Sequence, residues 1–413
     1  MATPSSPLPK ETLDEFWKAV EINEEEASIL IIYEKKDGID YRKQTIVCTT
    51  REELIKALGE SGSRNYGVLD RYNFSKKHVF PKEYVYITGC DSGFGRIAVD
   101  LFDKQGLGVF AGVFFPQSVD KLRQECPSGR VVPVQVNVTN EGSVLEAARQ
   151  IREHLEAQGA KLAAVVNNAG ILVQPCPTEW QSMKDFRDMF DVNVIGMACV
   201  TQSVLPLIRA SQGRIVCTSS IAGRMGLPTE AAYCASKYAV QGYCDTLRRD
   251  MLPWNVTVSI VEPGVFPNTG LYERFEKGLD AVWDRLDPKI KEDYGAEHYQ
   301  YVRRALTSAL TEFGSEDSSL VSKAYLHAVT SPQPKYRYRI GTDSKYIITP
   351  LSHLHESTQD MVLTLDNPKN PTVKPAKAPQ NGRALALGRM DKGWKQFIAM
   401  VLLAAIVLYK LRK

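Results

Sequence analysis

The sequence predicts an α/β protein built on a doubly wound parallel sheet, with a small N-terminal α/β unit and a C-terminal hydrophobic helix beside it. From residue 83 to about 365, short runs rich in β-branched residues alternate with helical stretches, as in strands joined by crossover helices. The expected strands span residues 84–88, 108–114, 131–136, 163–166, 214–218 and 257–261. A chain of 413 residues with 44% apolar and 24% charged residues is neither disordered nor a multi-span membrane protein.

Four parts can be distinguished along the chain. They are an N-terminal α/β unit, the sheet domain, an extended and unpacked Pro-rich basic linker, and the C-terminal helix, at residues 1–81, 82–365, 366–391 and 392–413. The first part is expected to hold helices at 11–20 and from about 50, and strands at 28–33, 41–48 and 66–69. Asp37 and Gly38 predict a hairpin turn between its first two strands, because Gly readily adopts a positive φ.

The C-terminal part predicts a membrane anchor. Residues 397–409 are uninterruptedly apolar, and the run reaches about 18 residues, from 394 to 411, if the flanking lysines extend to the lipid headgroups. Residues 368–413 hold ten Lys or Arg and one acid, a net charge of +9. Because the whole chain has a net charge of +3, the remaining body carries −6. A membrane surface is the partner expected for this tail, and nucleic acid is not expected for the acidic body. A buried hydrophobic helix is the alternative.

The first twenty residues contain prolines and charges and no apolar run, so no secretory signal is expected. An anchored chain would then keep residues 1 to about 390 in the cytosol. A short anchor with a basic end suits the mitochondrial outer membrane, whereas the family resemblance described below implies the endoplasmic reticulum. The eight cysteines include no pair at the spacing of zinc or redox sites, so we expect reduced cysteines and no metal.

A glycine-rich turn follows the first strand of the sheet domain and leads into a helix. It consists of Thr88, Gly89, Cys90, Asp91, Ser92, Gly93, Phe94 and Gly95. Glycine permits a tight turn and a close approach of the backbone to a pyrophosphate, and the free N–H groups at the start of a helix favour the anion. Such a loop taken alone is also an ordinary tight turn, so its assignment as a dinucleotide site depends on context.

Tyr233 and Lys237 lie four residues apart in an expected helix from 231 to 251, and therefore on one face of it. A cation near a phenol favours the phenolate and lowers its pKa, which makes tyrosine usable in proton transfer. The same spacing is common on solvated helices.

Ser220 follows the strand at 214–218, where α/β folds place ligand groups, although a helix cap is the alternative. Asn193 lies in an apolar helical stretch, where the alternative is a buried amide satisfied by the backbone.

Together these residues resemble the short-chain dehydrogenase/reductase family, whose sheet is of the Rossmann type. The motifs occur in the order of the family: the glycine loop, Asn167-Asn168-Ala169-Gly170, the tetrad of Asn193, Ser220, Tyr233 and Lys237, and Pro263-Gly264. Segments 283–286, 291–295 and 337–343 further resemble the retinol and 17β-hydroxysteroid dehydrogenase branch, with 3-hydroxybutyrate dehydrogenase as a near relative.

The resemblance implies an oxidoreductase that interconverts a hydrophobic alcohol, such as retinol, a hydroxysteroid or a similar lipid, and its carbonyl with NAD or NADP. Tyr233 would be the general acid and base, and Lys237 would hold the nicotinamide ribose and lower the pKa of Tyr233. Ser220 would bind the substrate oxygen and Asn193 would support a proton relay. The cofactor would be held by Thr88, Gly89, Asp91, Ser92, Gly93, Phe94, Gly95, Asn137, Val138, Asn168, Ala169, Gly170, Tyr233, Lys237, Pro263, Gly264 and Val265. Members of the family commonly form homo-oligomers.

Three positions depart from the family pattern. The second strand ends in Phe114 and Phe115, where an acid for the ribose 2′-OH or an Arg for a 2′-phosphate is usual, so NAD is favoured only by the resemblance. Asn137 stands where the family commonly has Asp. At position 268, where the family has Thr, this chain has Asn268, and Thr269 follows it. The contact to the nicotinamide amide is therefore expected to shift by one residue.

Two regions allow more than one interpretation. An aromatic stretch after residue 270 fits either a lid over an apolar substrate or plain core, and includes Tyr272, Phe275, Leu279, Trp283, Tyr294, Tyr299 and Tyr301. The N-terminal unit faintly resembles the first part of an actin-depolymerising domain but lacks its closing elements, so a packing or substrate-side extension is favoured. The alternative to an enzyme is a nucleotide-binding, tail-anchored protein whose N-terminal unit recruits a partner.

Overall fold

The computed structural model describes residues 28–36, 39–48, 66–68, 82–269, 275–363 and 373–378. The chain divides into two compact units, residues 1–77 and 78–413, and each is described here by itself. The helices expected at 11–20 and near residue 50, and the anchor expected at 392–413, lie outside the described residues.

Three strands of the N-terminal unit form an antiparallel sheet in the order β2-β1-β3. They are β1 (Ser28–Lys36), β2 (Ile39–Cys48) and β3 (Tyr66–Val68). Lys36 pairs with Ile39 at the end of the β1–β2 pairing, and the turn expected at Asp37 and Gly38 lies outside the described residues. The three expected strands of this unit are therefore present.

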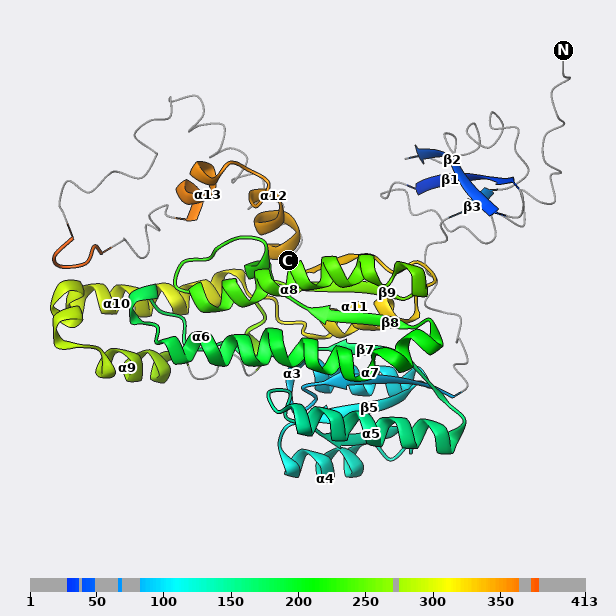
Figure 1. Cartoon of the computed structure of the whole chain (residues 1–413). Helices are drawn as coiled ribbons and strands as arrows, with labels where there is room; N and C mark the ends of the chain where they lie inside the picture. Colours follow the sequence, from blue (N-terminus) through cyan, green and yellow to red (C-terminus); the bar gives the residue numbers. More distant parts are fainter. Residues whose placement is uncertain are drawn as a thin grey trace, which may run out of the picture. The chain divides into compact units, whose positions relative to one another are not determined.

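Seven parallel strands form the sheet of the second unit, in the order β10-β9-β8-β7-β4-β5-β6 (Figure 1). Their bounds are β4 (Glu83–Thr88), β5 (Gly108–Val113), β6 (Val131–Gln135), β7 (Lys161–Asn167), β8 (Arg214–Thr218), β9 (Thr257–Pro263) and β10 (Arg337–Ile340). The predicted doubly wound sheet is confirmed, with the six expected strands in place. The short edge strand β10 was not expected, because its sequence is half charged.

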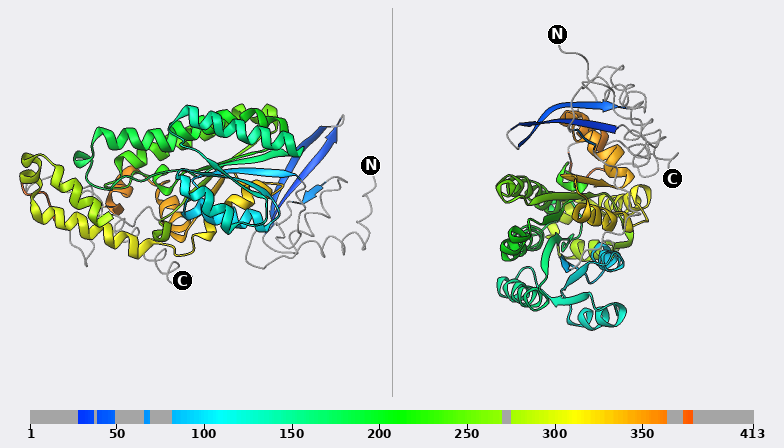
Figure 2. Two further views of the ribbon diagram at one scale, coloured as in Figure 1. Left: turned by 90° about the horizontal axis from the view of Figure 1, so that it is seen from below. Right: turned by 90° about the vertical axis from the view of Figure 1, so that its right-hand side faces the viewer.

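Helices cover both faces of this sheet, as Figure 2 shows. One face is covered by α3 (Gly93–Lys104), α4 (Pro116–Glu125) and α11 (Ser319–Thr330), whose apolar side chains pack with Val85, Ile87 and Val109. The opposite face is covered by α5 (Glu141–Gln158), α7 (Met197–Ser211) and α8 (Ala231–Asp250). Each strand interior is thus buried on both sides, which explains the apolar runs in the sequence. Two short helices, α12 (Thr349–Leu351) and α13 (Glu356–Leu363), follow β10.

One long helix among the described residues is apolar enough to cross a membrane by length and composition. It runs from 183 to 211 and joins α6 (Met183–Phe190), the π-helical turn Asp191–Gly196 and α7. Its Met189, Val200 and Val204 are fully buried in the core, so this is a core helix of the sheet domain.

The aromatic stretch forms a core of its own. Two further helices, α9 (Phe275–Arg285) and α10 (Pro288–Phe313), lie together at one end of the sheet (Figure 1). The Trp283 ring stacks on Tyr299 with a centroid distance of 4.7 Å, and Trp180, 1% exposed, contacts both Trp283 and Tyr294. These contacts favour the core interpretation for the described aromatic residues. Tyr272 lies outside the described residues, as does the side chain of Phe275.

Residues 373–378 belong to the linker that was expected to be unpacked, but they pack against α10. The N–H groups of Ala376 and Lys377 donate to the carbonyls of Tyr294 and Asp293, at 3.0 and 2.9 Å, and the Lys377 ammonium lies 2.8 Å from Glu292. These acceptors lie beside Gly295, whose φ of +77° kinks α10. At a kink, some carbonyls lose their hydrogen bonds within the helix. The linker segment supplies N–H donors for the two carbonyls at this kink.

Candidate active site

The glycine loop forms a tight turn between β4 and α3. Gly89 and Gly93 have φ of +70° and +57°, a conformation that other residues rarely adopt. A Cβ at Gly95 would overlap the Gly89 carbonyl and lie 2.6 Å from the Asn168 side-chain nitrogen. Each of these three glycines is therefore required by backbone conformation or by close packing.

Asn168 joins this loop to the turn after β7. Its Nδ2 atom donates to the carbonyls of Thr88 and Gly89, at 2.9 and 3.0 Å, while the Thr88 hydroxyl accepts from the N–H groups of Asn168 and Ala169. Tyr325 of α11 donates to the Asn168 Oδ1 atom at 3.0 Å. Sequence analysis missed Tyr325, because a tyrosine in an ordinary amphipathic helix carries no local signal of such a contact.

A groove of about 810 Å³ runs along the carboxyl ends of the strands, within the usual size range of ligand sites. Of the residues predicted to bind the cofactor, it is lined by Gly89, Asp91, Ser92, Gly93, Phe94, Asn137, Val138, Asn168, Ala169 and Gly170. Thr88 and Gly95 are not among its lining residues but support the loop. Asn268 and Thr269 both reach the groove, so both remain candidates for the contact expected to shift by one position.

At the end of β5 the structure places a carboxylate that the linear sequence conceals. Asp91 reaches from the glycine loop and accepts hydrogen bonds from the N–H groups of Phe114 and Phe115, at 2.9 and 3.1 Å. The two phenylalanine rings touch edge to face and are half exposed along the groove. An acid therefore lies where the sequence alone shows two aromatic residues.

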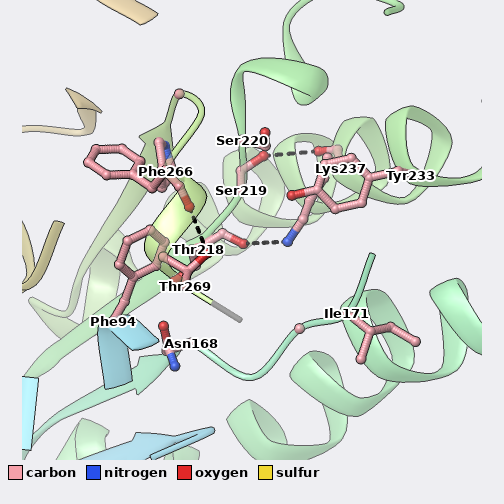
Figure 3. Close-up of a pocket in the computed structure, with 13 residues that line it drawn as sticks. Phe94, Asn168, Ile171, Thr218, Ser219, Ser220, Tyr233, Lys237, Phe266 and Thr269 are labelled. Atoms are coloured by element: carbon pink, nitrogen blue, oxygen red, sulfur yellow. Dashed lines mark hydrogen bonds between the residues drawn. The ribbon is translucent and has the colours of Figure 1, made fainter. Parts of the chain in front are cut away.

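A second, smaller pocket adjoins the groove and holds three members of the predicted tetrad (Figure 3). Tyr233, Ser220 and Lys237 all line it. The Lys237 ammonium donates to the Thr218 carbonyl at 3.1 Å and lies 5.5 Å from the centre of the Tyr233 ring. The helix α8 and the strand end of β8 thus bring these side chains together, although 13 residues separate Ser220 from Tyr233.

Burial controls the protonation of this pocket. Burial raises the pKa of Tyr233, and the neighbouring Ser220 hydroxyl opposes that shift. The expectation that Lys237 lowers the pKa of Tyr233 stays a prediction, because burial is the largest effect on the pKa of Tyr233 in this structure. Burial also lowers the pKa of Lys237 to about 8.

Asn193 lies behind the pocket, in the π-helical turn between α6 and α7, a feature that often marks functional sites. Its Oδ1 atom accepts from the Ile171 N–H at 2.8 Å, and its Nδ2 atom donates to the Ile171 carbonyl at 3.0 Å and to Ser236 at 3.1 Å. The amide is thus satisfied by the backbone, as the alternative interpretation anticipated. Its contacts fix Ile171, a residue that lines both cavities.

The loop after β9 completes the pocket. Pro263, Gly264, Phe266 and Thr269 line it, whereas the N–H of Val265 points to the Asp343 carboxylate. The neighbouring Glu262 is 1% exposed and accepts from Arg224 at 2.8 Å and from Gln241 at 2.9 Å. Gln241 also donates to Ser219, which in turn donates to the Lys237 carbonyl. Sequence analysis missed this buried polar network.

Comparison with known proteins agrees with this geometry. A family profile described as "short chain dehydrogenase" matches residues 83–279. Retinol dehydrogenase 7 of Rattus norvegicus is 38% identical over 297 residues, which cover 72% of this chain and 90% of that protein. The 17-beta-hydroxysteroid dehydrogenase type 6 of Homo sapiens is 38% identical over 289 residues, with 70% and 89% covered.

The chain belongs to the short-chain dehydrogenase family. The expected branch, that of the retinol and 17β-hydroxysteroid dehydrogenases, is also confirmed, and the chain is an oxidoreductase of this type. Solved structures share the fold at lower identity. A short-chain dehydrogenase/reductase from Burkholderia phymatum in complex with NAD has a TM-score of 0.55 and 24% identity, covering 72% of this chain and 99% of that one. One from Burkholderia cenocepacia in complex with NADP has a TM-score of 0.51 and 21% identity, covering 68% and 97%.

The packing at Gly95 yields a first prediction. We expect Gly95→Ala to lower the free energy of unfolding by about 1–3 kcal/mol, because its methyl group would overlap the Gly89 carbonyl. Gly242→Ala is the matched control, since a Cβ at this exposed position of α8 meets nothing within 4 Å and should stabilise the helix by about 1 kcal/mol. Urea unfolding of both variants measures the effect. Equal stability of the Gly95 variant and the wild type would contradict the close contact.

The buried ammonium of Lys237 yields a second prediction. Its pKa of about 8 in the folded protein means that burial costs stability below pH 8, and that this cost disappears as the pH rises towards 10.5. We expect Lys237→Met to gain most relative to the wild type at pH 7, by up to about 3 kcal/mol, and to lose most of this advantage by pH 10. Thermal unfolding at several pH values measures the difference. Lys121→Met, at an exposed position of α4, is the control. A difference independent of pH would show that Lys237 is not buried as a cation.

Proposed function

We propose that this protein catalyses the reversible oxidation of a hydrophobic alcohol to its carbonyl compound with a nicotinamide dinucleotide. The observation that carries the proposal is the assembly of Tyr233, Ser220 and Lys237 in one pocket that adjoins the groove of the glycine loop. The two cavities share lining residues, among them Phe94, Gly170 and Thr269, so a ligand lying in the groove can extend into the pocket. A protein that only binds nucleotide has no need of this assembly.

The groove fits a dinucleotide. Gly89 and Gly93 give the loop its tight turn beside the groove, and the N-terminus of α3 presents free N–H groups suited to a pyrophosphate. The half-exposed rings of Phe114 and Phe115 offer an apolar surface at the far end of the groove. When bound, the nicotinamide would supply or take up the hydride.

The chain's own residues would bind the substrate oxygen and move one proton. In the direction of reduction, the Tyr233 hydroxyl donates its proton to the carbonyl oxygen, and the raised pKa of Tyr233 keeps that proton in place beforehand. Ser220 holds the same oxygen. Lys237, fixed by the Thr218 carbonyl, places a positive charge beside the phenol and favours the phenolate that remains. Asn193 holds the Ile171 backbone at the pocket wall.

The class of substrate is inferred from the relatives. Relatives at 37–38% identity include proteins named retinol dehydrogenase 7 and 17-beta-hydroxysteroid dehydrogenase type 6, and both kinds of alcohol are hydrophobic. Phe94, Ile171 and Phe266 give the pocket an apolar wall. Such alcohols partition into bilayers, so the hydrophobic segment at 394–411 would bring the enzyme to its substrate. Three points stay predictions: that the sheet domain lies on the cytosolic side, that the membrane is the endoplasmic reticulum or the mitochondrial outer membrane, and that the protein forms a homo-oligomer.

Tyr233→Phe tests the proposed acid and base. We expect the full-length variant to lose about 10²–10⁴-fold in turnover of retinol or a hydroxysteroid, because the phenyl ring cannot donate or accept the proton. Binding of NADH should be retained. Tyr238→Phe is the matched control, since Tyr238 is the next tyrosine of α8 and is 47% exposed. Turnover by Tyr233→Phe at the wild-type rate would refute the proposed role, and no turnover of retinol, a 3α- or 17β-hydroxysteroid or 3-hydroxybutyrate by the wild type would refute the substrate class.

Asp91 favours NAD over NADP. Its carboxylate caps the two N–H groups that follow β5, the place where dinucleotide folds recognise the ribose 2′-OH. A 2′-phosphate at this place would meet a like charge, which raises its binding free energy.

The corresponding measurement is the ratio of kcat/KM with NAD to that with NADP. We expect a ratio above about 10 for the wild type and a clearly smaller ratio for Asp91→Asn, which keeps the size of the side chain and removes its charge. Asp120→Asn, on the exposed side of α4, is the control. An unchanged ratio in Asp91→Asn would mean that this carboxylate does not select the cofactor.

A further inference from the structure

Asp343 is a buried carboxylate that the proposed mechanism does not use. It follows β10, and its side chain is 2% exposed. Its Oδ2 atom accepts a hydrogen bond of 2.7 Å from the N–H of Val265, 78 residues earlier in the chain. Burial raises the pKa of Asp343 to about 6, against the effect of the donating N–H groups, so the carboxylate is ionised at pH 7.5.

Two glycines make room for this carboxylate. A Cβ at Gly264 or at Gly341 would overlap it, and Gly341 has a φ of +104°, which other residues rarely adopt. Gly264 also lines the catalytic pocket, so the carboxylate lies directly behind a wall of that pocket. Burying a charge there is costly, and the charge-assisted bond to Val265 offsets part of that cost.

The chain around Asp343 holds the end of β9 at three points. The Ile340 carbonyl accepts from the Gly264 N–H at 2.8 Å, Asp343 accepts from Val265, and Ser344 donates to the Glu262 carbonyl at 3.0 Å. The first bond continues the strand pairing. The bond to Asp343 lies beyond the strand, where the chain turns into the loop that carries Phe266 and Thr269 to the pocket.

We propose that Asp343 is a positioning residue, which holds the turn at Gly264 and Val265 so that the loop of residues 263–269 forms the wall for the nicotinamide half of the cofactor. This inference rests on the proposed function. The loop follows β9, whereas the aromatic end of the groove follows β5, four strands away and roughly 19 Å apart at the usual strand spacing. Loss of the Asp343 bond should therefore weaken binding of the nicotinamide half and leave binding of the adenosine half unchanged.

Two probes isolate the contribution of the nicotinamide ring: NADH, and ADP-ribose, which has both phosphates and both riboses and lacks only this ring. We expect Asp343→Ala in the full-length protein to weaken NADH binding by about tenfold or more, measured by calorimetry, with less than about a twofold change for ADP-ribose. Asp343→Asn retains an oxygen that can accept from the Val265 N–H and should recover most of the NADH affinity. Asp103→Ala removes a hydrogen-bonded carboxylate on α3, away from the pocket, and is the matched control.

Each outcome is decisive. If the wild-type protein binds neither NADH nor NADPH, the proposed function fails. If the wild type binds NADH and Asp343→Ala binds it equally well, the inference is overturned while the proposed function stands. A proportional loss of both probes would show a merely structural role and would also overturn it. Should Asp343→Ala be too unstable to purify, Asp343→Glu, whose longer side chain displaces the Val265 N–H, gives the same comparison.

Discussion

The site depends on the close approach of two turns, one after β4 and one after β7. Parallel pairing of these neighbouring strands brings their carboxyl ends together, and the absence of side chains at Gly89 and Gly95 lets the turns touch. Asn168 lies between the two turns, and its side chain donates to the carbonyls of Thr88 and Gly89 in the glycine loop. From this point the groove extends towards β5 and β6 on one side, and the pocket lies towards β8 and β9 on the other. Any displacement here would move the dinucleotide groove relative to Tyr233.

Local sequence patterns were sufficient for the elements and for the order of the motifs. Apolar β-branched runs indicated six of the seven strands of the main sheet, because strands buried on both faces must be apolar along their length. The spacing of Tyr233 and Lys237 placed them on one face of α8, which is where they lie. Contacts between distant segments left no such pattern. Asp91 meets the end of β5 and Asp343 meets Val265 through pairings that only the folded chain creates.

Burial explains why the expected electrostatics of the pocket did not follow from residue types alone. Lys237 is a cation near a phenol, but both groups are removed from water, and this raises the pKa of Tyr233 and lowers that of Lys237. In the Glu262 network, by contrast, the buried carboxylate is paired with arginines and hydrogen-bonded. Through Gln241 and Ser219 it connects β9 to the backbone of Lys237. Rigid positioning of the lysine is thus shared by two strands and one helix.

The segment at 373–378 has a practical consequence for anyone who shortens this protein to remove its hydrophobic end. A chain cut before Val373 would leave the carbonyls of Asp293 and Tyr294 without the partners that now cap the kink of α10. It would also remove the Val373 carbonyl that His298 contacts at 2.6 Å, next to Trp180. The position of the cut, and not only the loss of the apolar run, therefore determines whether a shortened chain keeps the bend of this helix.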